Sequence, residues 1–101
     1  MDPDRRWART LGTLLGGHDL TDDDTAWVMG EVVQGSATPA RLAAFLAALR
    51  AKGETSVEVR GLVRALIEHA TTITVPGRIV DVVGTGGAGG LNISTMASIV
   101  V

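Results

Sequence analysis

Apolar residues recur at helical spacing through residues 1–70, and the pattern predicts four helices there. The third helix has the clearest signals. Thr38 can cap its first turn, Pro39 suits the first helical position, and Gly53 follows its last turn. Its apolar positions i, i+3, i+4 and i+7 are Leu42, Phe45, Leu46 and Leu49.

The first two helices are predicted from their start and stop signals. The first begins near Pro3 and is stopped by the glycine pair at 16–17. The second begins after Thr21, with Asp24 placed to complete a capping box, and ends at Gly35. Leu11, Leu14 and Leu15 give the first helix its helical spacing.

The second and fourth helices each have an apolar stripe that we expect to be buried. In the second helix the stripe consists of Ala26, Met29, Gly30 and Val33. In the fourth, which begins at Thr55 or Ser56, the stripe consists of Val59, Leu62, Val63, Leu66 and Ile67. Trp7 and Trp27 are expected to pack between helices.

The pattern changes after residue 70. Residues 71–78 are rich in β-branched side chains and contain a Pro-Gly turn, so they read as a linker. The apolar run at 79–83 is typical of a strand buried on both faces, as in a parallel sheet. A glycine loop follows, and Asn92 begins a second helical pattern.

The predicted fold class is therefore mainly α. A four-helix N-terminal domain at 1–70 and a linker at 71–78 precede the first strand, glycine loop and helix start of an α/β domain at 79–101. One parallel strand cannot make a sheet, because its backbone groups need partners. We therefore expect the chain to be the front part of a longer protein.

Charge and composition exclude several classes of partner. A net charge of -2 without a basic stripe argues against nucleic acid and against an anionic membrane surface. Residues 82–101 carry no charge, but their glycines and polar side chains are unsuited to a membrane span. There is no cysteine and no signal peptide pattern, and a cytoplasmic location is expected.

The run GTGGAGGLNIST at 84–95 is the candidate binding site, and it can be interpreted in three ways. A P-loop needs a lysine that this loop lacks. A dinucleotide fingerprint is matched by Gly84, Gly86 and Gly89, although so many glycines make that match weak. The third interpretation is a phosphate cradle, and the structural alternative is a turn followed by a helix cap.

The phosphate cradle gives a role to residues 92–95, which have none in the dinucleotide fingerprint. Glycines let backbone N–H groups approach an anion, and the N-terminus of the following helix adds donors and positive potential. Asn92 and the hydroxyls of Ser94 and Thr95 supply further donors, and a serine hydroxyl can also bind magnesium. The combined run therefore favours binding of phosphate or pyrophosphate.

GTGG and NIST after the strand IVDVV resemble anthranilate phosphoribosyltransferase, of the superfamily that includes pyrimidine nucleoside phosphorylases. The upstream text LTDDDTAWVMGEVVQGSATPARLAAFLAALRAKGET resembles the helical N-terminal domain of that family. The resemblance covers nearly the whole chain but only the front part of such an enzyme.

The resemblance implies transfer of phosphoribosyl from phosphoribosyl pyrophosphate (PRPP) to anthranilate in tryptophan biosynthesis, with Mg²⁺ as cofactor. It implies that Gly84 lies near both anthranilate and PRPP, and that Ser94 is also a magnesium ligand. No catalytic residue falls in this chain, and the helical domain is implied to form a homodimer. The residues implied to bind PRPP are Gly84, Gly87, Asn92, Ile93, Ser94 and Thr95.

The loop departs from the family pattern. Ala88 stands where the family has an aspartate, and the loop is shorter before Asn92. The family's KHGNR segment, anthranilate-binding arginine and Asp-Glu magnesium pair would follow residue 101, so the chain alone is predicted to be inactive. A non-catalytic helical dimerisation module and a pyrimidine nucleoside phosphorylase remain as alternatives.

Two other groups of polar residues attract attention without indicating chemistry. His18 and His69 have no second ligand type at metal spacing. His69 lies near a helix C-terminus, where an imidazolium would suit the helix dipole. The acids at 22–24 fan around a helix and are expected to form a solvated first turn.

Overall fold

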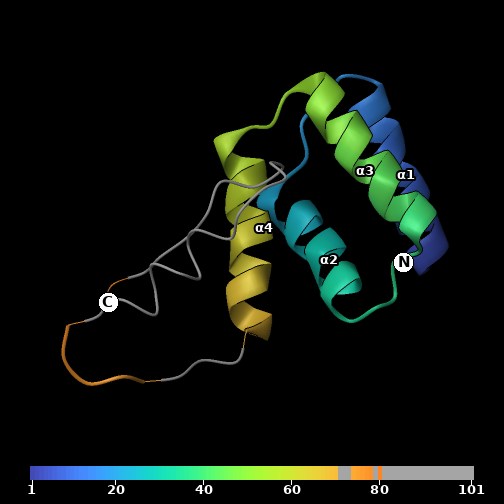
Figure 1. Ribbon diagram of the computed structural model, residues 1–101. Helices are drawn as coiled ribbons and strands as arrows, with labels where there is room; N and C mark the ends of the chain where they lie inside the picture. Colours follow the sequence, from blue (N-terminus) through green and yellow to red (C-terminus); the bar gives the residue numbers. More distant parts are fainter. Residues whose placement is uncertain (71–73, 79, 81–101) are drawn as a thin grey trace, which may run out of the picture. The chain divides into compact units, whose positions relative to one another are not determined.

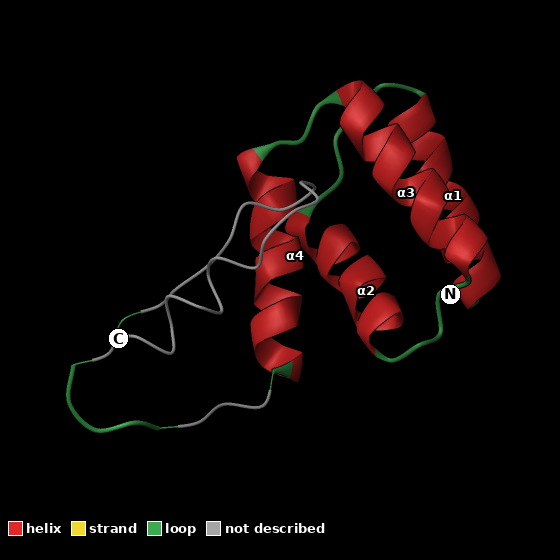
Figure 2. Ribbon diagram, in the orientation of Figure 1, coloured by secondary structure: helices red, strands yellow, loops and turns green. Residues whose placement is uncertain are grey.

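A computed structural model describes residues 1–70, 74–78 and 80 of the 101-residue chain. The contacts divide the chain into two units, Met1–Thr71 and Thr72–Val101. The first unit contains four helices, drawn in Figure 1 and in red in Figure 2. They are α1 (Pro3–Leu15), α2 (Asp22–Val33), α3 (Pro39–Lys52) and α4 (Ser56–His69).

The predicted capping box of α2 is confirmed. The Thr21 hydroxyl accepts a hydrogen bond from the Asp24 N–H at 3.1 Å, and the Asp24 carboxylate accepts one from the Thr21 N–H at 3.3 Å. The acids Asp22, Asp23 and Asp24 occupy the first turn, where the positive end of the helix dipole stabilises them. The start of α2 is therefore encoded locally.

The signals at the ends of α3 are confirmed as well. The Thr38 hydroxyl accepts from the Arg41 N–H at 3.2 Å, and Pro39 occupies the first helical position. Gly53 follows the last turn with a φ of 95°, in the left-handed region that favours glycine. At the next helix the cap is Thr55 rather than Ser56, because Thr55 forms a second capping box with Glu58.

The helices pack mainly in two pairs, α1 with α3 and α2 with α4, as Figure 1 shows. The Trp7 and Trp27 rings, from α1 and α2, lie 5.4 Å apart between centroids at an interplanar angle of 58°. The expectation that both tryptophans pack between helices is confirmed. The buried apolar core that joins the pairs consists of Trp7, Leu14, Leu20, Val28, Phe45, Ala48 and Leu49.

The prediction of buried apolar stripes was wrong for α2 and α4. In α2 the buried residues are Thr25 and Val28, whereas Val33 is exposed. In α4 the buried residues are Glu58, Gly61 and Ala65. Four of the five predicted stripe residues of α4, all except the half-buried Leu62, are exposed: Val59, Val63, Leu66 and Ile67.

The close approach of α2 to α4 explains why small residues of α4 are buried. A Cβ atom added at Gly61 would overlap both the Asp22 carbonyl oxygen and the Thr25 hydroxyl. The Thr25 hydroxyl also donates a hydrogen bond to the Glu58 carbonyl oxygen at 2.8 Å. Large aliphatic side chains do not fit in this contact, so they lie on the other side of α4.

Residues 74–78 and Val80 belong to the second unit and have no regular secondary structure. Gly77, which follows Pro76, has a φ of 89°, in the left-handed region that favours glycine. The predicted strand at 79–83 has only Val80 among the described residues, and the glycine loop and helix start lie outside them. The strand, loop and domain boundaries therefore stay predictions.

Candidate functional site

The predicted phosphate cradle lies outside the described residues. The structure therefore leaves its geometry, and the roles assigned to its residues, as predictions. The residues concerned are Gly84, Gly87, Asn92, Ile93, Ser94 and Thr95. The bundle of residues 1–70 contains two other polar features, a buried ion pair and an open hollow.

The most deeply buried charges in the bundle form an ion pair between α3 and α4. The Lys52 Nζ atom lies 2.9 Å from Glu58 Oε1 and 2.8 Å from Asp19 Oδ1. The Glu58 side chain is fully buried, and only 4% of the Lys52 side chain is exposed. A buried charge is tolerated only where it is paired and hydrogen-bonded.

Backbone groups complete this cluster. Glu58 Oε1 accepts the Thr55 N–H, and Glu58 Oε2 accepts the Leu20 N–H, both at 2.8 Å. Lys52 Nζ also donates to the Gly53 carbonyl oxygen at 2.7 Å. We call Asp19, Lys52 and Glu58 the Lys–Glu lock, because they join the loop before α2 to the end of α3 and the start of α4.

The surroundings determine the protonation of the Lys–Glu lock. Burial is the largest single effect on Glu58 and opposes its ionisation. Hydrogen bonds from the Leu20 N–H, the Lys52 ammonium and Thr55 outweigh it, so the pKa of Glu58 is lowered. The hydrogen bond to Asp19, followed by that to Glu58, raises the pKa of Lys52.

The Lys–Glu lock is suited to structure rather than to catalysis. All three ammonium protons of Lys52 have acceptors, and both oxygens of Glu58 have donors. No group of the pair is left to meet a substrate. The sequence prediction missed the lock, although Thr55-x-x-Glu58 is a capping-box pattern that would have revealed one of its contacts.

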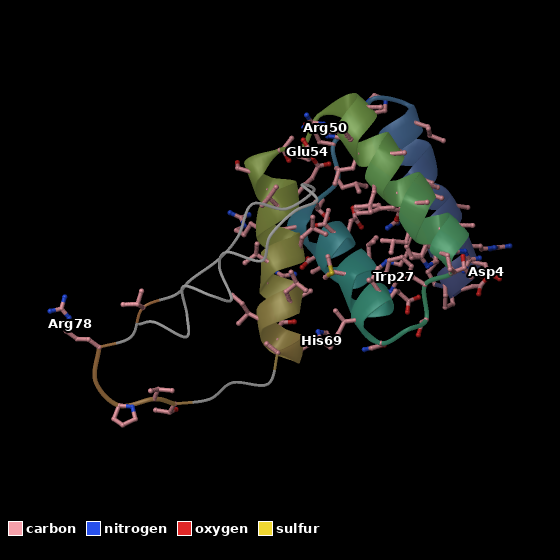
Figure 3. All side chains as sticks on the ribbon, viewed as in Figure 1. Asp4, Trp27, Arg50, Glu54, His69 and Arg78 are labelled. Atoms are coloured by element: carbon pink, nitrogen blue, oxygen red, sulfur yellow. The ribbon has the colours of Figure 1, made fainter. Side chains whose placement is uncertain are left out.

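A second polar feature is an open hollow of about 280 Å³ between α2 and α4. His69, at the end of α4 (Figure 3), forms one side of it. Its Nδ1 atom lies 2.8 Å from the Ala65 carbonyl oxygen and therefore carries the proton. The residues lining the hollow are Ala26, Trp27, Gly30, Glu31, Gln34, Glu68 and His69.

The hollow does not assemble a catalytic set. The Nε2 atom of His69 is 3.4 Å from the Gln34 amide nitrogen, a long contact to a group that is neither nucleophile nor acid. His18 is exposed on the loop after α1. The predicted position of His69 at a helix C-terminus is confirmed.

Of the three acids at the start of α2, Asp22 and Asp23 face arginines of α4, whereas Asp24 pairs with Arg9 of α1 at 3.3 Å. Arg64 lies 2.7 Å from the Asp23 carboxylate and 3.3 Å from that of Asp22, and Arg60 lies 3.5 Å from Asp22.

In residues 1–70, 74–78 and 80, no group of three His, Cys, Asp or Glu side chains could hold a metal ion. None of the described helices has the length and apolar character needed to cross a membrane.

The chain has close relatives among proteins of known function. The chain is 59% identical over 99 residues to anthranilate phosphoribosyltransferase of Streptomyces avermitilis. The aligned region covers 96% of the chain and 28% of the relative. The enzymes of that name from Saccharopolyspora erythraea and Thermobifida fusca are 58% and 54% identical, over 94% and 96% of the chain and 28% of each relative. The chain thus spans about 28% of the length of these relatives.

These relatives confirm the resemblance inferred from the glycine loop and the helical segment. Residues 9–70, which include α2, α3, α4 and most of α1, match the helical bundle domain of a glycosyl transferase family. The match covers more than half of the chain and agrees with the helical bundle that the structure describes. The chain therefore belongs to this glycosyl transferase family, and its first unit is the family's helical bundle domain.

Proposed function

We propose that the chain is the N-terminal part of an anthranilate phosphoribosyltransferase, a cytoplasmic enzyme of tryptophan biosynthesis that transfers phosphoribosyl from PRPP to anthranilate. One observation carries this proposal. Three relatives with this name match between 94% and 96% of the chain at 54% to 59% identity. Such identity extends beyond residue 70, and so includes sequence outside the helical domain.

In this proposal the residues after 78 hold PRPP. Backbone N–H groups at Gly84 and Gly87, with Asn92, Ile93, Ser94 and Thr95, bind its phosphate oxygens. Gly84 also borders anthranilate. Negative charge builds on the departing pyrophosphate, so donors directed at it lower the barrier to transfer.

The proposal assigns Ser94 to a magnesium ion that neutralises phosphate charge when bound. A hydroxyl oxygen is a suitable ligand for this hard cation, which usually also keeps waters and phosphate oxygens. One hydroxyl does not make a site. The remaining protein ligands belong to the polypeptide that would follow residue 101.

The proposal gives the first unit a supporting role. Residues 1–70 form the helical bundle and one face of a homodimer, residues 71–78 link it to the next domain, and residues 79–101 begin an α/β domain. The buried polar atoms of the Lys–Glu lock are satisfied within the bundle. This supports a rigid base rather than a catalytic part.

Calorimetry on a longer polypeptide tests the proposal. The remainder of the Streptomyces avermitilis relative is appended after residue 101, and PRPP is titrated in the presence of Mg²⁺. We expect heat of binding and, when anthranilate is then added, release of pyrophosphate and formation of phosphoribosyl anthranilate. Ser94→Ala should weaken PRPP binding at least about tenfold, the loss expected for a charge-assisted hydrogen bond, whereas Ser36→Ala in the bundle should not.

Two results would contradict the proposal. The absence of any heat with PRPP would favour a helical dimerisation module whose loop binds nothing. Phosphorolysis of a pyrimidine nucleoside without transfer to anthranilate would favour the nucleoside phosphorylase alternative. A third result would contradict a different expectation, namely that the chain alone is inactive. That result is product formation by the 101-residue chain without the longer polypeptide.

A further inference from the structure

The two helix pairs of the bundle share little apolar contact with each other. One pair is α1 with α3, and the other is α2 with α4. Within residues 1–70, five of the seven buried core residues lie on α1 and α3, and only Val28 lies on α2. The fourth helix reaches this core through the half-buried Leu62. Apolar burial therefore does little to join α4 to α1 and α3.

Two of the connections that cross between the pairs meet at the Lys–Glu lock. Figure 1 shows the α1–α2 and α3–α4 connections at one end of the bundle and the α2–α3 connection at the other. Glu58 Oε2, at the start of α4, accepts the Leu20 N–H of the α1–α2 connection at 2.8 Å. Lys52 Nζ, at the end of α3, lies 2.8 Å from Asp19 Oδ1 and 2.9 Å from Glu58 Oε1. The Glu58 carboxylate thus binds α4 both to α3 and to the connection that follows α1.

Two further contacts between the pairs lie elsewhere, between α1 and α2. The Trp7 and Trp27 rings are in contact there, and Arg9 forms an exposed ion pair with Asp24 at 3.3 Å. An exposed pair of this kind contributes little. Neither contact involves α4, and the ion pairs of Arg64 join α4 to its own partner α2. The Lys–Glu lock is therefore the contact that holds α4 to the α1–α3 pair.

Burial gives the Lys–Glu lock a different effect from that of an apolar contact. A buried ion pair adds little net stability relative to apolar side chains of similar volume, because both charges lose their hydration. A buried polar network whose groups are all hydrogen-bonded instead fixes one arrangement of the elements that carry it. Glu58 is fully buried, so separating the pairs would take the Lys52 ammonium and the Leu20 N–H from its carboxylate at the same time.

We propose that the Lys–Glu lock couples the two helix pairs, so that the bundle opens as one unit while the lock is intact. Without the lock, α2 and α4 separate from α1 and α3 in a local opening that needs less free energy than global unfolding. The inference concerns the bundle alone, and it stands or falls independently of PRPP binding and of the longer polypeptide. It gives the lock a conformational role beyond its share of the stability.

Native-state hydrogen exchange of the 101-residue chain tests the inference, because it measures the opening of each helix separately. Protection factors of the backbone amides are measured by NMR in the unaltered chain and in the double variant Lys52→Met, Glu58→Gln. This variant removes both buried charges, and the glutamine side-chain oxygen can still accept the Leu20 N–H. The matched control is Arg50→Met with Glu54→Gln, which removes the exposed ion pair at 3.4 Å beside the same connection.

A second control separates coupling from stability. Thr38→Ala removes the cap of α3 and leaves the Lys–Glu lock intact. The loss of a cap destabilises the folded state as a whole. The slowest-exchanging amides of all four helices should therefore lose protection by the same factor in this variant.

In the unaltered chain, the slowest-exchanging amides of both pairs should share one protection factor. In the double variant, those of α2 and α4 should be protected at least about tenfold less than those of α1 and α3, whereas both controls should keep the pairs equal. Equal protection of the pairs in the double variant, or unequal protection in the unaltered chain, would overturn the inference. If the double variant lacks helical circular dichroism, Glu58→Gln alone is measured against the same two outcomes.

Discussion

At the scale of single residues, Gly61 sets the distance between α2 and α4. Its hydrogen atom faces the Asp22 carbonyl oxygen and the Thr25 hydroxyl, where a methyl group would overlap both. Gly61→Ala should therefore destabilise the bundle by about 1–3 kcal/mol, the usual cost of overpacking a tight core. Urea unfolding followed by circular dichroism measures this change.

Gly12 provides the control for this prediction. A Cβ atom at Gly12 would meet nothing within 4 Å, and the residue lies inside α1. Gly12→Ala should stabilise the bundle by about 0.5–1 kcal/mol, because alanine loses less backbone entropy in a helix. Equal destabilisation by both substitutions would show that the α2–α4 contact is not as close as described.

The Lys–Glu lock predicts how stability depends on pH. The pKa of Glu58 is lower in the folded bundle than in the unfolded chain, so its carboxylate stabilises the fold at pH values above the ordinary glutamate pKa of about 4.3. That contribution is lost as the pH falls through the folded-state pKa. Glu58→Gln should lower the melting temperature at pH 7 and flatten the loss of stability in acid.

Glu54→Gln is the matched control for the same measurement. Glu54 forms an exposed ion pair with Arg50 at 3.4 Å, one turn away along the chain. Surface pairs of this kind contribute about 0–1 kcal/mol, so its removal should leave the melting temperature and acid profile nearly unchanged. Identical profiles for the two variants would mean that Glu58 is not the carboxylate that the bundle depends on.

At the scale of elements, the helix starts are the parts that single side chains control. Thr38 caps α3 alone, without a capping-box partner, so its hydroxyl can be removed cleanly. Thr38→Ala should cost about 0.5–2 kcal/mol of unfolding free energy. Thr13→Ala, whose hydroxyl donates to the Arg9 carbonyl oxygen within α1, should cost less than about 0.5 kcal/mol.

The positions of the helices could be predicted from sequence because their signals are local. Thr21, Thr38, Pro39 and Gly53 act within one turn of themselves, and the structure places each as expected. The buried faces could not be predicted in the same way. The spacing of apolar residues shows which side chains share a face of α4. It does not show which face of α4 packs against α2.

The candidate site shows the same division. Glu58 is recognisable as a capping residue from Thr55-x-x-Glu58, but its pairing with Lys52 depends on how α3 and α4 meet. The phosphate cradle could be proposed only because glycines, a helix start and hydroxyls follow each other directly. Its geometry depends on residues outside the part that the structure describes.

At the scale of the whole molecule, Met1–Thr71 should fold without the rest of the chain. The unit contains all four described helices and its own apolar core. For its length we expect a stability of about 4–10 kcal/mol. A polypeptide of residues 1–71 should show the helical circular dichroism and cooperative melting of the 101-residue chain, whereas a non-cooperative transition would contradict an independent unit.

The tilted pair of Trp7 and Trp27 gives the protein a built-in fluorescent reporter. These are the only tryptophans in the chain, and the Arg6 guanidinium lies 4.5 Å from the Trp27 ring centroid. Tryptophan fluorescence will therefore come entirely from these two rings, which lie where α1 meets α2. The emission maximum and the lifetime of this fluorescence will therefore report the melting of the bundle around the two rings.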